Sequence, residues 1–297
     1  MPRSLATRCV SWAPFRRRWT QFSLGTLLLA VTAICVWLAL QVNRARAQRE
    51  AVAAVVARHG AVGYEESSLL PAGRFPVDLF RNSLGIDYFD RVVSVNLRRR
   101  MAGDSDVAKL KSLTYLTELD LYNTDVTDAG MRFLGSLTTL KKLDLGYTKI
   151  GDAGVAELEG LTGLEELSLM GTRITNVGLE HLEKMTRLRS LNISGTKVTD
   201  RALARLAGLQ SIESLDLGVT AVTDAGLASL KPVQQIKQLN LYNTRVTDAG
   251  LVHLAEFESL QFLNLTALPL TSSAVTKLKT ALPKCRIEYW ALTRPSR

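Results

Sequence analysis

Apolar residues recur in a fixed frame, L-x-x-L-x-L, that restarts every 24 residues from position 92 to position 260. Strict alternation of apolar and polar residues, as in Leu119-Asp120-Leu121, predicts one short strand in each repeat. Further along, apolar residues at three-residue steps, such as Met131, Leu134 and Leu137, favour one face of a helix. A period of this length is typical of a solenoid, in which each repeat buries its apolar side against its neighbours.

The order of strand, turn, helix and return predicts an α/β solenoid, with a parallel sheet on one face and helices on the other. Consecutive strands should then lie about 4.8 Å apart. The eight repeats begin at residues 92, 116, 140, 164, 188, 212, 236 and 260.

Two polar positions recur with the same period. In the six inner repeats a threonine follows the strand, whereas Arg100 and Leu268 hold this position at the two ends; the threonines are Thr124, Thr148, Thr172, Thr196, Thr220 and Thr244. Because a hydroxyl there can bond the backbone of the turn, we interpret this column as structural. Three residues later, Thr127 and its counterparts are good helix N-caps. The acid that follows, such as Asp128, is favoured in the first turn of a helix by its charge.

One long segment, Phe22 to Val42, carries no charge. Its 21 residues correspond to about 31 Å of helix, which matches a hydrocarbon core of about 30 Å. Arginines stand on both sides, and Trp19 and Trp37 lie near the two ends, as interfacial aromatic residues do. We therefore predict a transmembrane helix, kept as a signal anchor rather than cleaved at the small-residue site that ends at Ala47.

These signals divide the chain into five parts. Gly60 is expected to end a helix that continues out of the membrane, Ala61–Tyr64 to form a short strand, and 70–76 to form a loop. The parts are a basic tail (1–21), the transmembrane helix (22–42), a juxtamembrane helix with the N-terminal cap (43–91), a solenoid of about eight repeats (92–281), and a C-terminal cap strand and tail (282–297).

Charge is distributed unevenly along the 297 residues, whose net charge is +9. Residues 1–50 hold eight Arg and one acid, 51–114 hold nine basic residues and seven acids, and 115–297 hold twenty of each. The repeats therefore offer no single-sign field for a nucleic acid. The arginines around the apolar segment slightly favour an N-terminus inside and repeats outside the cytoplasm. Three cysteines make no disulfide framework.

The repeated frame L-x-x-L-x-L-x-x-T-x-V-T-D-A-G-L resembles the leucine-rich repeat family in its 24-residue variety. Residues 92–290 carry this resemblance, which implies the solenoid fold and a role in binding. The chain is most similar to membrane-anchored repeat proteins of some bacteria, and more distantly to the repeats of F-box proteins. It differs from the commonest pattern in placing Thr where Asn or Cys usually follows the strand.

Motifs for catalysis are missing from the sequence: it has no phosphate-binding glycine loop, G-x-S-x-G, H-E-x-x-H or C-x-x-C. His181 and His253 occupy the same position three repeats apart, hence about 14 Å apart, too far to share a metal ion. Helix capping explains the acids of the T-D pairs better than a calcium ladder does. We predict no enzyme activity, cofactor, metal or small-molecule substrate.

The residue between the two leucines of each strand points away from the core and forms an exposed sheet face. This column is short and polar throughout, as in a solvated or hydrogen-bonded ladder, whereas its neighbours vary. Tyrosine and methionine are enriched at protein interfaces. The predicted protein-binding residues are Glu118, Asp120, Tyr122, Lys142, Asp144, Tyr147, Glu166, Ser168, Met170, Asn192 and Tyr242.

These features favour one of three functions. The leading hypothesis is a non-catalytic, single-pass membrane scaffold whose sheet face binds an unknown protein or peptide outside the cytoplasm. The alternative, implied by the F-box resemblance, is a substrate adaptor that faces the cytoplasm, although a membrane span stands where an F-box would precede the repeats. An enzyme with a site in the cap ranks last, because it has few candidate acids and bases.

Overall fold

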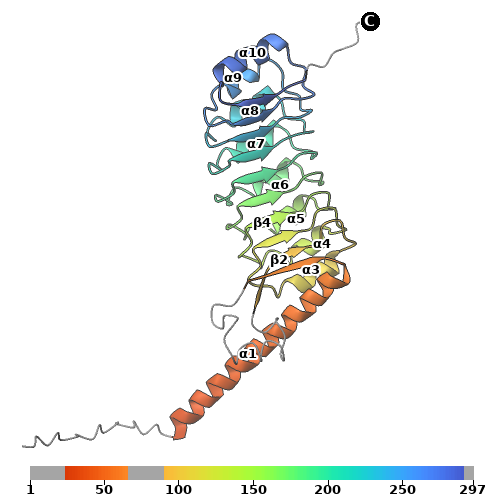
Figure 1. Cartoon of the computed structure of the whole chain (residues 1–297), viewed down its shortest axis with the longest axis vertical. Coiled ribbons are helices and arrows are strands. Elements are labelled where there is room, and N and C mark those ends of the chain that lie inside the picture. The colour runs from red at the N-terminus through yellow and green to blue at the C-terminus, as the bar shows by residue number, and fades with distance from the viewer. Residues whose placement is uncertain (1–23, 66–89, 291–297) are drawn as a thin grey trace, which may run out of the picture. The chain divides into compact units, whose positions relative to one another are not determined.

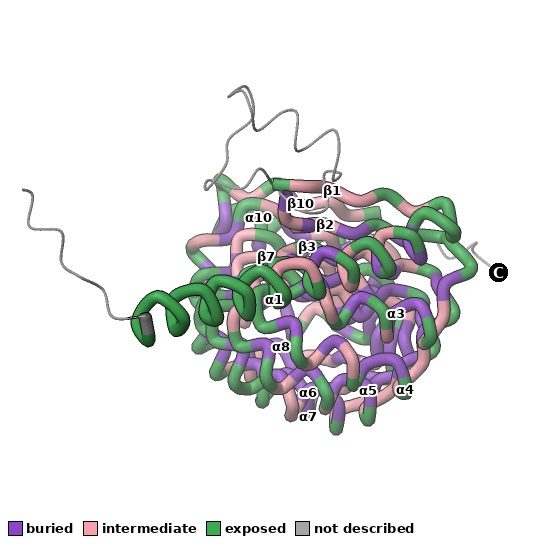
Figure 2. The backbone as a smooth tube through the Cα atoms, turned by 90° about the horizontal axis from the view of Figure 1, so that it is seen from below, coloured by how far each residue is buried: buried purple, intermediate pink, exposed green. Residues whose placement is uncertain are grey.

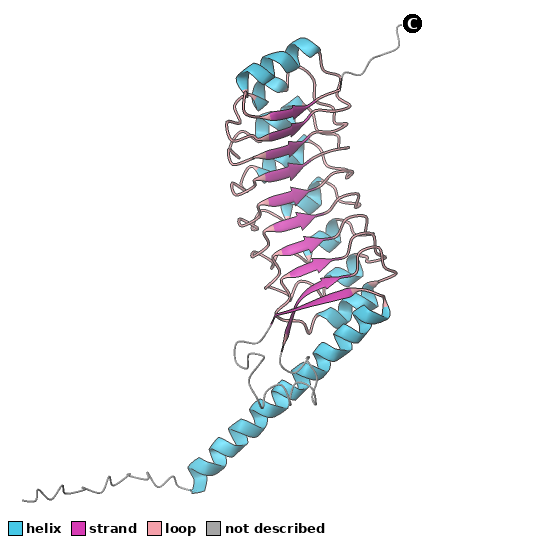
Figure 3. Ribbon diagram, in the orientation of Figure 1, coloured by secondary structure: helices cyan, strands magenta, loops and turns pink. Residues whose placement is uncertain are grey.

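The computed structural model of the chain describes residues 24–65 and 90–290. The chain divides into two compact units, Met1–Asn43 and Arg44–Arg297. In the second unit ten strands form a single sheet in chain order, and the helices of the repeats stack behind it (Figures 1 and 3). The strands are β1 (Ala61–Glu65), β2 (Arg91–Asn96), β3 (Glu118–Asp120), β4 (Lys142–Asp144), β5 (Glu166–Ser168), β6 (Ser190–Asn192), β7 (Ser214–Asp216), β8 (Gln238–Asn240), β9 (Phe262–Asn264) and β10 (Arg286–Glu288).

The repeats stack without a shift of register. Leu119 pairs with Leu143 and Leu143 with Leu167, and the same alignment holds for every parallel pair from β2 to β10. These leucines are buried, whereas the residues on either side of them in each strand are at least partly exposed. Because all strands share one register, each sequence column becomes a straight row of side chains across the sheet. The predicted α/β solenoid is confirmed.

The helices behind the sheet are shorter than the apolar pattern predicts. The helix α4 ends at Met131, and the amides of Leu134, Leu137 and Leu140 each donate to the carbonyl three residues back. A three-residue step matches the 3.0 residues per turn of a 3₁₀ helix, so a chain of tight turns keeps these leucines on the core side. The helices are α1 (Leu24–Ala57), α3 (Asp104–Leu110), α4 (Asp128–Met131), α5 (Asp152–Ala156), α6 (Asn176–Glu180), α7 (Asp200–Leu206), α8 (Asp224–Ser229), α9 (Leu251–Leu254) and α10 (Ser272–Ala281).

The recurring threonine closes the turn of its own repeat. Thr124 Oγ1 donates to the carbonyl of Leu121 at 2.7 Å, and Thr220 Oγ1 to that of Leu217 at 2.6 Å. The same bond occurs in the four repeats between and beyond them. The column is buried, so each hydroxyl satisfies a carbonyl that water does not reach. The structural interpretation of these threonines is confirmed, and their bonds lie within repeats rather than between them.

The threonines before the helices act as N-caps in several repeats. Thr127 Oγ1 accepts from the amide of Ala129, and Thr175 and Thr223 make the equivalent bond. Thr199 makes no cap bond, because its hydroxyl accepts from Asn176 Nδ2 of the preceding repeat.

The acids of the T-D pairs need a correction. Asp128, Asp200 and Asp224 do lie in the first turn of their helices, whereas Asp248 precedes α9, and the carboxylates of all four bind the next repeat. Asp200 accepts from the backbone amide of Thr223 at 2.7 Å and from its hydroxyl at 2.6 Å. A Cβ on Gly226 would lie 2.5 Å from Asp200 Oδ1, which explains the glycine in T-D-A-G. The motif is therefore a link between repeats as well as a helix start.

The second part of α1 closes the N-terminal end of the solenoid. Ala51 and Val55 are buried in the common core, and β1 pairs antiparallel with β2. Gly60 has a different role from the one predicted, because the left-handed residue after the helix is His59, with φ of 57°. A Cβ on Gly60 would lie 2.7 Å from the carbonyl oxygen of Asn96, so glycine is needed for close approach. The predicted loop at 70–76 lies outside the described residues.

The C-terminal end is closed by α10 and β10. Leu278 and Leu282 are buried in the core, and Tyr289 Oη donates to the carbonyl of Leu270 at 2.7 Å. The strand predicted within 282–290 is present at Arg286–Glu288, parallel to β9.

The first part of α1 is exposed and apolar. Among the described helices it is the one long and apolar enough to cross a membrane, with a mean hydropathy of 2.1 and none of its most apolar window buried. The exposed colour covers this part of α1 in Figure 2, where buried residues gather inside the coil of the second unit. Leu28 and Leu29 are 66% and 70% exposed, which costs free energy in water and not in hydrocarbon.

Candidate functional site

The exposed sheet face forms a shallow hollow over strands β2 to β6, with a volume of about 490 Å³. Its floor is made by the side chains that flank the buried leucines, brought together because the repeats share one register. The predicted residues that line it are Glu118, Asp120, Lys142, Asp144, Glu166, Ser168 and Asn192.

The short polar column has a structural task as well as an exposed position. Asp120 Oδ1 accepts from the amide of Tyr122 at 3.0 Å, and Asp144 Oδ1 accepts from that of Gly146 at 2.9 Å. Asn192 makes the equivalent bond. A short side chain that bonds the amide two residues ahead turns the chain at the end of its strand. One oxygen of each of these two carboxylates thus serves the fold, while the same residues line the hollow.

Lys142 lies between two glutamates of neighbouring strands. Its Nζ is 3.1 Å from Glu166 Oε1 and 3.8 Å from Glu118 Oε1. The hydrogen bond and charge of Glu166, followed by the charge of Glu118, raise the pKa of the Lys142 amine above its ordinary value. All three side chains are about half exposed, so these ion pairs contribute little to stability and leave charged groups open to a partner.

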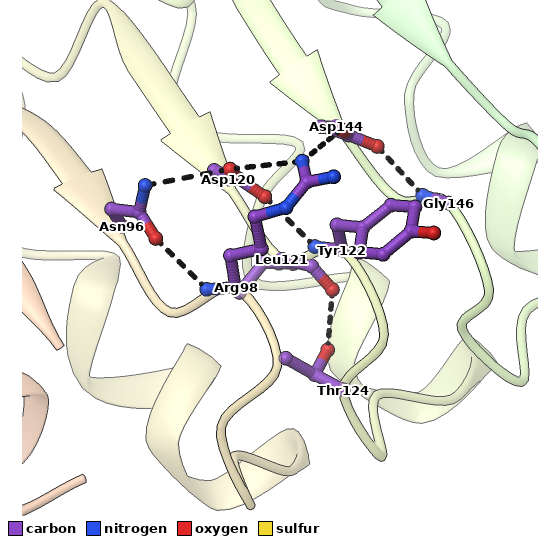
Figure 4. A network of polar contacts seen from close by, with 8 residues as sticks. All are labelled: Asn96, Arg98, Asp120, Leu121, Tyr122, Thr124, Asp144 and Gly146. Atoms are coloured by element: carbon purple, nitrogen blue, oxygen red, sulfur yellow. Dashed lines mark hydrogen bonds and ion pairs between the residues drawn. The ribbon is translucent and has the colours of Figure 1, made fainter. Parts of the chain in front are cut away.

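Arg98 is a contributor to the site that the sequence interpretation missed. Its Nη1 lies 3.6 Å from Asp120 Oδ2 and 3.5 Å from Asp144 Oδ2, and its guanidinium stacks 3.9 Å from the centre of the Tyr122 ring (Figure 4). The sequence did contain an indication of this role, because Arg98 occupies the same column as Tyr122 one repeat earlier.

An aromatic pair borders the hollow at the carboxyl ends of the strands. The rings of Tyr122 and Tyr147 meet edge to face with centres 5.4 Å apart. Met170, two repeats beyond Tyr122 in the same column, is half-buried, and its carbonyl accepts from the amide of Tyr147 at 2.7 Å. Tyr147 is 47% exposed. The residues of the predicted cluster therefore lie on neighbouring repeats of one surface: Tyr122, Lys142, Asp144, Tyr147, Glu166 and Met170.

Tyr242 lies apart from this cluster, four repeats beyond Tyr147 in the stack. Its neighbour is Val219, whose amide donates to the carbonyl of Tyr242 at 2.7 Å. Both side chains are exposed, Val219 by 49% and Tyr242 by 43%. The sequence interpretation did not single out Val219.

The histidines lie on the helix side. His181 Nδ1 is 2.6 Å from Glu159 Oε1, and this contact, together with Lys184, lowers the pKa of Glu159. Within residues 24–65 and 90–290, no group of three or more His, Cys, Asp and Glu side chains is arranged to hold a metal ion. The sheet face offers carboxylates, amides, an ammonium and phenol rings, which are groups for recognising another chain.

Comparison with known proteins agrees with this architecture. The family model described as Leucine Rich repeat matches residues 112–135 and 136–158. The solved structure of an internalin C2 from Listeria monocytogenes aligns with a TM-score of 0.54 and 20% identity, and the alignment covers 67% of this chain and 81% of that one. At this identity the likeness concerns the fold. The comparison with curated proteins gives no match. The matched repeats and the likeness of fold both support a leucine-rich repeat family for this chain.

Proposed function

We propose that this protein is a membrane-anchored, non-catalytic scaffold that binds another protein or a peptide through its exposed sheet face. The observation that carries the proposal is the open hollow over β2 to β6, bordered by the Tyr122–Tyr147 pair. Charged and aromatic side chains remain exposed along one surface, as expected where a partner supplies the missing contacts. Leucine-rich-repeat proteins generally serve as interaction scaffolds.

The exposed apolar part of α1 supports the membrane anchor. Aliphatic side chains on all sides of a helix are stable in a bilayer, where the backbone bonds are satisfied within the helix. We propose that the segment is retained as a single-pass signal anchor and that the repeats face away from the cytoplasm.

Capture of partners in cells tests the binding surface. A variant with Tyr122→Ala, Tyr147→Ala and Met170→Ala should lose proximity-labelled partners that the wild-type chain collects. A control variant with Arg201→Ala and Val252→Ala, both exposed on the helix side, should collect the same set as the wild type. Equal capture by all three chains would reject the sheet face as the binding surface.

Protease accessibility tests the orientation. External protease added to spheroplasts should digest the repeats of the full-length chain while a cytoplasmic marker protein stays intact. Repeats that are digested only after lysis would favour the adaptor that faces the cytoplasm.

A further inference from the structure

One column beside the hollow has a left-handed backbone in every repeat. Gly171 and Gly195 adopt φ of 63° and 66°, and Tyr147 and Val219 adopt φ of 54° and 57°. Glycine adopts this conformation freely, whereas a β-branched or bulky residue does so only with strain. The full column is Arg99, Asn123, Tyr147, Gly171, Gly195, Val219, Asn243 and Ala267.

Tyr147 and Val219 are therefore large apolar side chains at positions that disfavour them. They are about half exposed, so burial in the core of the fold does not offset the strain. Strain of this kind tends to mark places that serve binding. We infer that both side chains are retained for contacts with another molecule.

The spacing of the two side chains limits what can bridge them. Three repeats separate Tyr147 from Val219, which corresponds to about 14 Å at about 4.8 Å per strand. The two residues between them in the column are Gly171 and Gly195, which have no side chain to obstruct a passing backbone. An extended peptide covers about 13 Å in four residues, and residues four apart project on the same side.

The neighbouring hollow selects the charge of the occupant. Four carboxylates line it, from Glu118, Asp120, Asp144 and Glu166, against one ammonium from Lys142, a balance of −3. The contact of Arg98 with Asp120 and Asp144 reduces this to −2. A basic segment would neutralise the excess, whereas an acidic one would meet like charge.

We propose that the sheet face binds an extended, basic peptide segment of a partner protein, a specification that rests on the proposed function. Two apolar residues of the segment, four apart, pack on Tyr147 and Val219. A Lys or Arg between or beside them reaches the carboxylates of Asp144 and Glu166. Arg98 shows the geometry available to such a cation, placed between carboxylates and over a tyrosine ring. The ring of Tyr147 has no such cation among the described residues and is open to one.

Three fluorescein-labelled peptides of about twelve residues test the proposal on the full-length chain in neutral detergent micelles. Each carries two tyrosines four residues apart, and the other variable positions are all Arg, all Ser or all Glu. Fluorescence anisotropy at about 0.1 M salt measures binding, where screening still permits local electrostatic selection. We expect the Arg peptide to bind at least about tenfold tighter than the Glu peptide, a difference of about 1.4 kcal/mol.

Two pairs of variants locate the effect. Asp144→Asn with Glu166→Gln should abolish the preference for Arg, while the same loss of charge on the helix side, Glu183→Gln with Glu256→Gln, should preserve it. Tyr147→Gly should weaken binding of the Arg peptide, while Asn123→Gly should not. Both glycine substitutions fall on left-handed positions, so the second controls for relief of strain.

Equal affinity for the three peptides, absence of binding, or preference for the Glu peptide would overturn the basic segment. A preference that survives the Asp144 and Glu166 changes would overturn the site. If these tests fail while the triple alanine variant still loses cellular partners, the sheet face binds a partner of other chemistry. If that loss is absent too, the proposed function fails with the inference.

Discussion

Replacement of Asp152, the first residue of α5, tests the link that this acid makes to the next repeat. Its carboxylate accepts three hydrogen bonds from the next repeat: from the amide and hydroxyl of Thr175, each at 2.7 Å, and from the amide of Gly178 at 3.0 Å. Asp152→Ala removes all three, leaves two backbone amides without a partner, and keeps the helix start otherwise unchanged.

The magnitude follows from the number of bonds. Hydrogen bonds to charged groups contribute about 1.5–3 kcal/mol each when buried, and these donors are only partly buried and regain water. We therefore expect Asp152→Ala to lower the free energy of unfolding by about 2–4 kcal/mol.

Asp152→Asn provides the matched comparison, because the chain already uses asparagine at this position in one repeat. Asn176 Oδ1 accepts from the amide of Thr199 at 2.9 Å, and its Nδ2 donates to the Thr199 hydroxyl at 2.9 Å. With asparagine at this position the repeat loses its N-cap bond, because the Thr199 hydroxyl accepts from Asn176 instead of from an amide of its own helix. Since a cap contributes about 1 kcal/mol, Asp152→Asn should cost about that much.

Urea unfolding of the full-length chain in detergent, followed by far-UV circular dichroism, measures both variants. Hydrogen exchange at the amides of Thr175 and Gly178 adds a local readout, which is useful because repeat proteins depart from two-state unfolding. Alanine and asparagine variants with equal stability, or an alanine variant within about 0.5 kcal/mol of wild type, would refute the link between repeats.

Two further predictions follow from the helix side. Gly178→Ala places a Cβ 2.6 Å from the carboxylate of Asp152 in the preceding repeat, so it should lower the urea midpoint of unfolding. In Gly208→Ala the nearest atom to the new Cβ is 3.8 Å away, so the midpoint should stay unchanged or rise. Equal midpoints for the two variants would contradict the close approach at Gly178. The pKa of Glu159, lowered by its hydrogen bond with His181, should rise toward its ordinary value in His181→Gln, as measured by carboxyl ¹³C NMR. Because the pKa of Glu159 is lower in the folded chain than in the unfolded one, the contact stabilises the fold above the unfolded pKa, and this stabilisation is lost as pH falls through the folded pKa. An unchanged titration of Glu159 in the His181→Gln variant would show that the contact has no effect.

The fold could be predicted because one pattern repeats. Alternation of apolar and polar residues around Leu119 and its counterparts predicts a strand. Because this pattern occurs in eight repeats at a constant interval, stacking of the repeats is the way in which each can bury its apolar side. The short helices were less predictable, since a three-residue apolar step fits both a helix face and successive tight turns.

The contacts of the site were less accessible to sequence reasoning for a physical reason. Asp152 binds a residue 23 positions ahead, and Arg98 reaches Asp144 across 46 positions, so both depend on the register between repeats. The left-handed backbone at Tyr147 and Val219 is not encoded by their own side chains, which disfavour it. The glycines and asparagines in the same column were the available signal.

Site-specific photocrosslinking tests the central claim, that the sheet face holds the partner. Benzoylphenylalanine is placed at Tyr147, an aromatic position 47% exposed on the binding side, or at Val252, 67% exposed on α9. After irradiation of cells, the account predicts a discrete higher-mass adduct from position 147 and none from position 252. An adduct from position 252 alone, or from both positions equally, would contradict it.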